Sequence, residues 1–314
     1  MSITSTMDSC STKPDMGLVV SREIRNRITL FSVYQRDVRC PEPMSYGDLI
    51  VPGEYRIHSR FSHAANYLQG EHFVSIVDPS IGAGPLNIVV ERYGDQKYDR
   101  VIVGNGYVIL NDCACKFMPA SRYDSSLPNL SQSEFQIIKY NLPNFKRLLI
   151  ELAPIKSIAF LLDESEESNT AASFEAMLKN QFLKSAKLIG DGRILDAVRI
   201  MKGLGFGLTP SGDDFISGLV LGLNLKQMIL KIDFKNLIED IDAIAQNENP
   251  LSRAWLRCAK EGRVFEKMKR AILALGRMDP DELLQATHGL LTVGSTSGVD
   301  MAIGFIYGIE KVQV

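Results

Sequence analysis

Cysteine, tryptophan and net charge are all scarce in this chain. Lys and Arg total 35 against 37 Asp and Glu, which leaves a formal charge of −2 at pH 7. A chain so close to neutral has no electrostatic footprint for nucleic acid or for an anionic membrane, and we expect neither as a partner. The five cysteines, an odd number spread over 314 residues, favour a reducing cytoplasm over a disulfide framework.

Long hydrophobic runs are also missing. The longest apolar stretch, residues 215–230, is interrupted by Asn224, Lys226 and Gln227 and falls short of a membrane span. The beginning of the sequence is polar and lacks the apolar segment of a signal peptide. We therefore predict a cytoplasmic protein without a membrane span and a flexible tail over residues 1–20.

Motifs for metal ions and nucleotides are absent as well. Cys113 and Cys115 are closer in sequence than the ligands of a zinc knuckle and no second pair follows, so we interpret them as two side chains on one face of a strand. The glycine-rich residues 205–214 lack the Lys of a Walker loop and follow no clear strand, which argues against a dinucleotide site. The sequence predicts no cofactor.

What the chain does contain is a β-rich part followed by a helical part. Residues 21–125 hold short β-rich runs separated by turn residues, and Asn105 and Gly106 between two such runs are a strong hairpin signal. We predict an antiparallel barrel or sandwich there, with its clearest strands at 28–33, 73–77, 86–90, 101–103 and 107–110.

Helical periodicity dominates residues 126–314, so the expected fold class is α+β, with the barrel or sandwich followed by an α-helical domain. Residues 119–135 are rich in Ser, Pro and Asn and predict a linker, and residues 157–162 predict an isolated strand. The predicted helices cover residues 170–189, 193–202, 211–230, 234–246, 252–261, 264–275, 280–290 and 298–311.

The most distinctive segment runs from Gly205 to Asp214 and reads GFGLTPSGDD, followed by an almost wholly apolar helix sequence. Its glycines allow positive φ or a close approach of the backbone to a ligand. Thr209 and Ser211 are N-cap candidates, because a hydroxyl can accept a bond from an orphaned backbone N–H. The segment predicts a glycine-rich loop that turns into a buried helix.

A second copy of this arrangement lies near the C-terminus. The spacing Ser-Gly-x-Asp-x3-Gly-x3-Gly from Ser297 to Gly308 equals the spacing from Ser211 to Gly222. Glycines four apart lie on one helix face and let another backbone approach closely. We therefore predict that the two helices cross at their glycine faces, and that both polar loops meet at one site.

Helix N-termini behind glycines favour an anion, such as a phosphate or a carboxylate. Three carboxylates, Asp213, Asp214 and Asp300, would repel that anion unless they hold Mg²⁺, bind an amide N–H or point elsewhere. An alternative is that the acidic residues only stabilise the first helical turn. The candidate substrate-binding residues in the two loops are Gly207, Thr209, Ser211, Gly212, Asp213, Ser295, Thr296, Ser297 and Gly298.

Three further polar residues are weaker candidates. His63 is a possible base or substrate contact, with a surface or structural histidine as the alternative. His288 lies in the helix leading to the second loop and is a candidate catalytic residue if it faces the site. Arg253 opens a helix and can clamp a carboxylate or phosphate, unless it is simply exposed to solvent.

These segments resemble a bacterial family, formerly of unknown function, that includes the oxamate carbamoyltransferase subunit AllH of allantoin catabolism. GLTPSGDD, from Gly207 to Asp214, looks like the family signature, and residues 291–300 are similar to its Gly-x-Thr/Ser-Ser-Gly-x-Asp segment. Residues 251–262 resemble its Ser-x-x-x-Leu-x-x-Ala-x-x-Gly helix. The resemblance covers residues 200–310, and it departs from the family at Phe206, where relatives tend to have Pro.

The resemblance implies transfer of a carbamoyl group between phosphate and the amide nitrogen of oxamate, in the degradation of purine nitrogen. It implies a complex with two other subunits, one of them similar to the acyl-CoA synthetase α-subunit, and it leaves a homo-oligomer open. Asp214, Asp300 and His288 are then the catalytic candidates, and replacing Asp214 or Asp300 by Ala is expected to abolish activity while the fold survives. The alternatives are a non-catalytic binding or scaffold subunit and a Mg²⁺-dependent phosphate enzyme.

Overall fold

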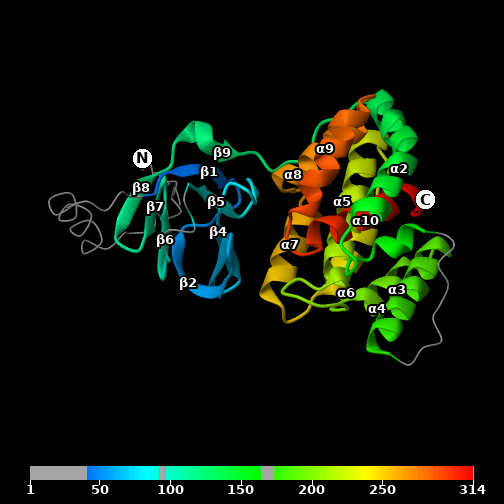
Figure 1. Ribbon diagram of the computed structural model, residues 1–314, viewed down its shortest axis with the longest axis horizontal. Helices are drawn as coiled ribbons and strands as arrows, with labels where there is room; N and C mark the ends of the chain where they lie inside the picture. Colours follow the sequence, from blue (N-terminus) through cyan, green and yellow to red (C-terminus); the bar gives the residue numbers. More distant parts are fainter. Residues whose placement is uncertain (1–40, 92, 94–96, 164–172, 314) are drawn as a thin grey trace, which may run out of the picture. The chain divides into compact units, whose positions relative to one another are not determined.

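The computed structural model describes residues 41–91, 93, 97–163 and 173–313 (Figure 1). The tail expected over residues 1–20 and the strand expected at 28–33 lie outside the described residues. Within the described part, a curled β-sheet is followed by a helical region, which confirms the predicted α+β class (Figure 1).

The sheet has nine strands in the order β8-β7-β6-β2-β3-β4-β5-β1-β9, so the described strands form an open half-barrel. Neighbouring strands are antiparallel except for β4 with β5 and β1 with β9. The strands are β1 (Pro43–Gly47), β2 (Gly53–Arg60), β3 (Ala64–Gln69), β4 (His72–Val77), β5 (Asn87–Val90), β6 (Arg100–Gly104), β7 (Tyr107–Leu110), β8 (Cys113–Lys116) and β9 (Arg122–Tyr123).

Two local predictions for the sheet are confirmed. Strands β6 and β7 form the expected hairpin, with Gly104 opposite Tyr107 and Gly106 at a φ of 86° in the turn. Cys113 and Cys115 are both buried on one face of β8, whereas the residue between them is exposed. The Cys115 thiol lies 2.9 Å from the Pro41 carbonyl oxygen, so these cysteines belong to the interior of the sheet.

The described part of the helical region contains α2 (Gln132–Leu152), α3 (Phe174–Gly190), α4 (Ile194–Met201), α5 (Ser211–Leu230), α6 (Lys235–Ala245), α7 (Pro250–Lys260), α8 (Glu266–Leu275), α9 (Pro280–Leu291) and α10 (Ser297–Glu310). The predicted helices are confirmed as α3 to α10, within a few residues at their ends; residues 170–172 of the first lie outside the described part. None of the described helices is long and apolar enough to cross a membrane.

Two predictions in this region are wrong. The expected linker ends in α2, whose start carries a capping box between Ser131 and Glu134, and the prediction missed that helix because Pro143 interrupts the helical pattern. The strand expected at 157–162 is instead a short 3₁₀ helix over Ala159–Leu162. A short apolar run has no period that distinguishes a strand from a helical turn, and here it buries Ile158 and Leu161 against the helices.

Helices α5 and α10 form the centre of the helical region and cross at their glycines, as predicted. A Cβ placed on Gly218 would lie 1.9 Å from the Met301 carbonyl oxygen. A Cβ on Gly304 would lie 1.9 Å from the Phe215 carbonyl oxygen. Because only hydrogen atoms fit at such separations, the repeated glycine spacing encodes direct backbone contact between the two helices.

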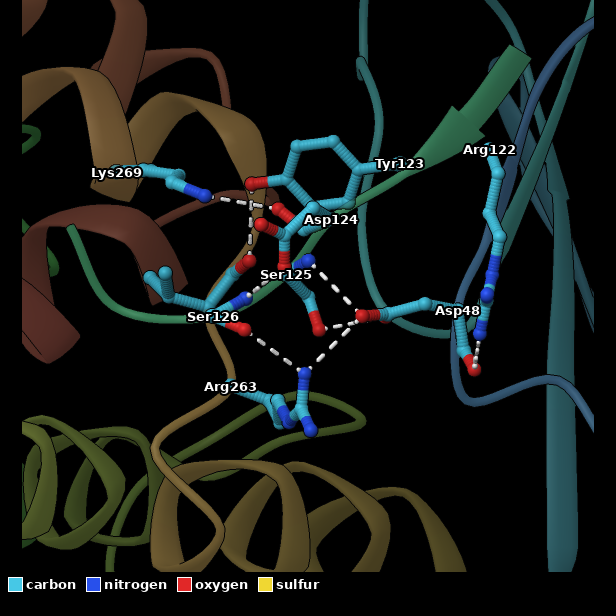
Figure 2. Close-up of polar contacts among 9 residues, drawn as sticks. Asp48, Arg122, Tyr123, Asp124, Ser125, Ser126, Arg263 and Lys269 are labelled. Atoms are coloured by element: carbon cyan, nitrogen blue, oxygen red, sulfur yellow. Dashed lines mark hydrogen bonds and ion pairs between the residues drawn. The ribbon is translucent and has the colours of Figure 1, made fainter. Parts of the chain in front are cut away.

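A polar cluster joins the sheet to the helical region (Figure 2). Asp48, which follows β1, accepts hydrogen bonds from the Ser125 N–H at 3.1 Å and from the Ser125 hydroxyl at 2.6 Å. Arg263, between α7 and α8, donates to the same carboxylate at 3.1 Å. The Asp48 side chain is only 8% exposed, so this ion pair is well shielded from solvent and holds the end of β1 against the α7–α8 connection.

Candidate functional site

The two Ser-Gly-x-Asp loops meet through the hydroxyl groups of Thr209 and Ser297, and no side chain caps α5. Helix α5 has Pro210 as its N-cap residue and no side-chain cap, so the expectation of Thr209 or Ser211 as N-cap is wrong. The Thr209 hydroxyl instead donates to the Asp214 carboxylate at 3.2 Å. It also lies 3.0 Å from the Ser297 hydroxyl, which links the first loop directly to the second.

The backbone N–H groups of Gly212 and Gly298, the glycines of the two repeated loops, are hydrogen-bonded within the chain. The Gly212 N–H donates to the Leu204 carbonyl at 2.8 Å, and the Gly298 N–H donates to the Val293 carbonyl at 3.1 Å. A Cβ on Gly212 would lie 1.9 Å from the Met201 carbonyl oxygen. These two glycines therefore allow close packing, and their N–H groups already have acceptors.

A cavity of about 610 Å³ opens beside the joined loops. The polar part of its wall on the helical side includes Thr209, Asp214 and Ser297. Phe73, from β4, and Trp255, from α7, line an apolar part of the same cavity. A concave, largely apolar site with a few convergent polar groups is typical of small-molecule binding.

Six of the residues proposed from the sequence line this cavity, and the others lie outside its wall. The lining residues are His63, Gly207, Thr209, Asp214, Ser295 and Ser297. Ser211, Gly212, Asp213, Thr296, Gly298 and Asp300 belong to the same two loop–helix junctions but do not line it, and neither do Arg253 and His288.

Of the three weaker candidates, His288 and Arg253 lie outside the cavity wall. His288 is exposed on α9, and Arg253 donates to the Asn247 carbonyl at 2.9 Å. His63 is largely exposed, with its Nδ1 4.0 Å from Asp78 Oδ1. Of the three, only His63 lies at the cavity, where it can contact a ligand.

Sequence reasoning missed the sheet side of the cavity. Asn66 on β3, Ser75 on β4 and Asn87 on β5 are buried polar residues that line it. The Ser75 hydroxyl donates to the Asn66 side-chain oxygen at 2.5 Å, and the Asn87 amide donates to the Gly82 carbonyl at 3.1 Å. Their only sequence signal is a polar residue inside an apolar strand, which by itself does not indicate what the residue faces.

The paired aspartates are the strongest electrostatic feature of the site. Burial, followed by the charge of Asp300, raises the pKa of Asp214 well above its usual value, while the Ser297 and Thr209 hydroxyls oppose that rise. Burial also raises the pKa of Asp300 to about 6. Asp300 Oδ1 accepts a hydrogen bond from the Ile158 N–H at 2.9 Å, and its Oδ2 is buried without a hydrogen-bond partner. Asp214 thus reaches the cavity and Asp300 lies behind it.

The comparison with known families gives a match that covers both of these aspartates. Residues 201–309 match the family model of the oxamate carbamoyltransferase subunit AllH. The AllH resemblance seen in the sequence motifs is thereby confirmed over this segment. No solved structure matches the chain.

The AllH match includes α5, α7 and α10 and therefore both loops of the site. It does not extend to the sheet, which supplies the opposite wall of the cavity. Among the described residues, no group of three or more His, Cys, Asp or Glu side chains is placed to hold a metal ion. The AllH-like segment thus contributes four hydroxyls, from Thr209, Thr292, Ser295 and Ser297, and the Asp214 carboxyl to the cavity.

The first loop is supported by two asparagines, Asn247 and Asn249, that the sequence motifs did not indicate as site residues. Asp213 accepts from the Gly203 N–H at 2.7 Å and from the Asn247 amide at 3.0 Å. Asn249 caps α7 through its oxygen, which accepts from the Leu251 N–H at 3.0 Å. Its amide group donates to the Leu208 carbonyl at 2.5 Å, so one side chain anchors both α7 and the glycine loop.

Two substitutions of Asn249 should separate its cap on α7 from its hydrogen bond to the Leu208 carbonyl. Asn249→Asp keeps the cap oxygen but loses the donor to Leu208, whereas Asn249→Ala loses both. We expect the free energy of unfolding to fall by about 1 kcal/mol in the Ala variant and by less in the Asp variant. Urea denaturation measures this, and equal losses in both variants would show that the cap does not stabilise α7.

The raised pKa of Asp300 predicts how stability depends on pH. The folded protein binds this proton more tightly than the unfolded chain, so the stabilisation is complete below about pH 4 and is lost as pH rises toward about 6. The loss corresponds to about 3 kcal/mol. Asp300→Asn keeps an acceptor for the Ile158 N–H and cannot ionise. Its free energy of unfolding, relative to that of the unsubstituted protein, should therefore rise by about 3 kcal/mol when the pH is raised from 4 to 8.

Denaturant titrations at both pH values measure this difference. Asp78→Asn is a control whose stability difference should hardly change between pH 4 and pH 8, because hydrogen bonds from Ser80 lower the pKa of Asp78 and its contribution is lost only below about pH 4. If the Asp300→Asn stability difference does not change with pH, the carboxyl titrates at the same pH in the folded and unfolded states.

Proposed function

We propose that this chain is a subunit of a carbamoyltransferase that acts on oxamate or a similar small amide or ureido carboxylate with carbamoyl phosphate. The observation that carries the proposal is the Thr209–Ser297 contact, because it joins both loops of the AllH-matched segment at the wall of one cavity. The proposed setting is the cytoplasmic degradation of allantoin and purine nitrogen. The proposed partners are other carbamoyltransferase subunits, including an acyl-CoA synthetase-like one.

The reaction forms a bond between the oxamate amide nitrogen and the carbamoyl carbon. It breaks the bond between that carbon and the phosphate oxygen, and the amide nitrogen loses one proton. A carboxyl group at the reacting atoms can accept this proton or supply one to the departing phosphate. We assign that role to Asp214, since it lines the cavity and burial favours its protonated form.

The remaining polar groups have supporting roles in this proposal. The Thr209 and Ser297 hydroxyls hydrogen-bond to the Asp214 carboxyl and orient it toward the substrate. Asp300 acts through Asp214, because its charge raises the Asp214 pKa. It is therefore a positioning residue and not a group that contacts the substrate.

The test is turnover by the assembly isolated through an affinity tag on this chain from its own host. We expect phosphate release from carbamoyl phosphate that depends on oxamate, and carbamoyl phosphate formation in reverse from the carbamoylated product and phosphate. An assembly that binds both substrates but releases no phosphate would contradict the proposal. Activity that disappears on chelation and returns with Mg²⁺ would favour the metal-dependent phosphate enzyme instead.

One observation favours a second candidate, a non-catalytic subunit that binds a metabolite or a partner. The N–H groups of Gly212 and Gly298, which the sequence suggested as anion donors, already have backbone acceptors. The cavity also has extensive apolar walls beside Asp214. Tight oxamate binding by the purified chain, together with full activity of an assembly that carries Asp214→Asn, would support this candidate.

A further inference from the structure

A basic side chain reaches the second loop from a helix that the sequence motifs did not single out. Lys267 lies in the first turn of α8, and its ammonium donates to the Thr292 hydroxyl oxygen at 2.5 Å and to the Ser80 carbonyl. Thr292 lines the cavity and uses its own hydroxyl proton on the Gly289 carbonyl, 2.8 Å away. Lys267 does not itself line the cavity, but its ammonium contacts a residue that does.

The stem of the Lys267 side chain passes beside two glycines. A Cβ on Gly82, in the β4–β5 connection, would lie 3.8 Å from Lys267 Cε, and a Cβ on Gly289 would lie 3.9 Å from its Cγ. The stem of Lys267 therefore packs between the β4–β5 connection and α9. Burial lowers the pKa of the Lys267 ammonium, as expected for a cation that has lost part of its hydration.

The neighbouring carboxylate is engaged elsewhere. Glu266 accepts a hydrogen bond from Arg270 at 2.5 Å and another from the Ala83 N–H at 2.9 Å. None of the ion pairs among the described residues includes Lys267. A half-buried ammonium that contacts only neutral oxygens gains more from an approaching oxyanion than a fully hydrated lysine does.

We propose that Lys267, with its ammonium positioned by Thr292, forms an oxyanion subsite at this wall of the cavity, which takes the phosphate or carboxylate group of the substrate. An ammonium has three N–H donors, and the Ser80 and Thr292 oxygens use two of them. No described residue accepts a hydrogen bond from the third, and we assign it to the ligand. Ser295, an exposed hydroxyl on the same stretch of the wall, can contribute a further donor. The subsite rests on the proposed function for the identity of its ligand.

A purely structural role for Lys267 predicts something different. If the ammonium only ties the β4–β5 connection to the second loop, its loss lowers the melting temperature and leaves the dependence of ligand binding on charge unchanged. If it binds an oxyanion, loss of the charge weakens binding and also removes the dependence of affinity on salt. A variant that keeps the charge should then restore the binding.

The experiment is calorimetric titration of the purified full chain with inorganic phosphate and, separately, with oxamate. Lys267→Met removes the charge and keeps an unbranched stem, Lys267→Arg keeps the charge, and Lys269→Met is the control. Lys269 lies on the same helix, donates to the Asp124 carbonyl at 2.8 Å (Figure 2) and does not line the cavity. We expect affinity to fall by about tenfold or more in Lys267→Met, to recover largely in Lys267→Arg and to stay unchanged in Lys269→Met.

The two titrants identify the group that is bound. Selective loss of phosphate binding assigns the subsite to the phosphate, and selective loss of oxamate binding assigns it to the carboxylate. Unchanged affinity for both titrants in folded Lys267→Met overturns the proposal, as does failure of the unsubstituted chain to bind either one. A Lys267→Arg variant that folds but binds as weakly as Lys267→Met also overturns it.

The same variant distinguishes failure of the Lys267 subsite from failure of the proposed carbamoyl transfer. An active assembly whose KM values do not change with Lys267→Met leaves carbamoyl transfer intact and removes the subsite. An assembly without turnover, whose oxyanion binding still depends on Lys267, removes carbamoyl transfer and keeps the subsite.

Discussion

Replacing Gly304 by Ala is expected to destabilise the protein by about 3 kcal/mol or more, because overpacking at a helix crossing forces the backbones apart. The added Cβ would lie 1.9 Å from the Phe215 carbonyl oxygen and 2.9 Å from the Phe215 Cα. Both are backbone atoms within α5, so no side-chain rotation relieves the clash. The only relief is a displacement of α10 from α5, which would disturb the centre of the core and the Thr209–Ser297 contact at the loops.

The control is Gly289→Ala, the same substitution inside another helix. The nearest atom to a Cβ on Gly289 is Lys267 Cγ at 3.9 Å, an ordinary contact. Removing glycine from a helix interior there should raise stability by about 0.5–1 kcal/mol. Thermal or urea unfolding compares the two variants, and a Gly304→Ala protein as stable as Gly289→Ala would show that the helices do not touch at their glycines.

Asp214→Asn is expected to reduce turnover of the assembly by about 10²–10⁴-fold, the usual contribution of a positioned proton-transfer group. The substitution keeps the shape of the side chain and an oxygen for the Thr209 hydroxyl, which donates at 3.2 Å. It removes the exchangeable proton that the buried carboxyl holds. The fold should survive, because the neutral amide has nearly the same shape as the protonated carboxyl it replaces and brings no charge into the buried site.

The measurement is kcat for oxamate-dependent phosphate release, together with the melting temperature. Asp213→Asn is the matched control: its carboxylate faces Gly203 and Asn247 outside the cavity, so stability should fall while most activity remains. Because the pKa of Asp214 is raised, the activity of the unsubstituted assembly should also change with pH where this carboxyl titrates, and that change should be absent in Asp214→Asn. If Asp214→Asn keeps more than half of the activity, Asp214 does not transfer the proton.

The elements with a strong local signal were predicted well. The prediction for α5 began and ended at the residues found, Ser211 and Leu230, because a glycine-rich turn precedes a continuous apolar segment. The Asn105-Gly106 hairpin was predicted for a similar reason, since the turn needs a positive φ that glycine adopts readily. By contrast, Pro143 lies inside α2 and interrupts its helical pattern, so the sequence does not predict this helix.

The candidate site also has features that the local sequence predicts and features that it does not. That the two loops meet followed from the sequence alone, because glycines repeated every four residues mark the contact face of each helix. Which groups of those loops remain available to a ligand did not follow. Leu204 and Val293 take the amides of Gly212 and Gly298, and no sequence rule predicts that choice, since it depends on which carbonyl the folded chain brings within reach.

The sequence by itself determined the α+β order of the chain, the buried helix pair and, through that pair, the convergence of two aspartates, because residue spacing within each element marks the face that it buries. Tertiary structure decided the rest: the polar strand residues opposite the loops, the burial that raises the Asp214 pKa, and the approach of Lys267 to Thr292. These features join residues far apart in sequence. Their energies depend on solvent exclusion and on distances that exist only after the sheet and the helices have packed together.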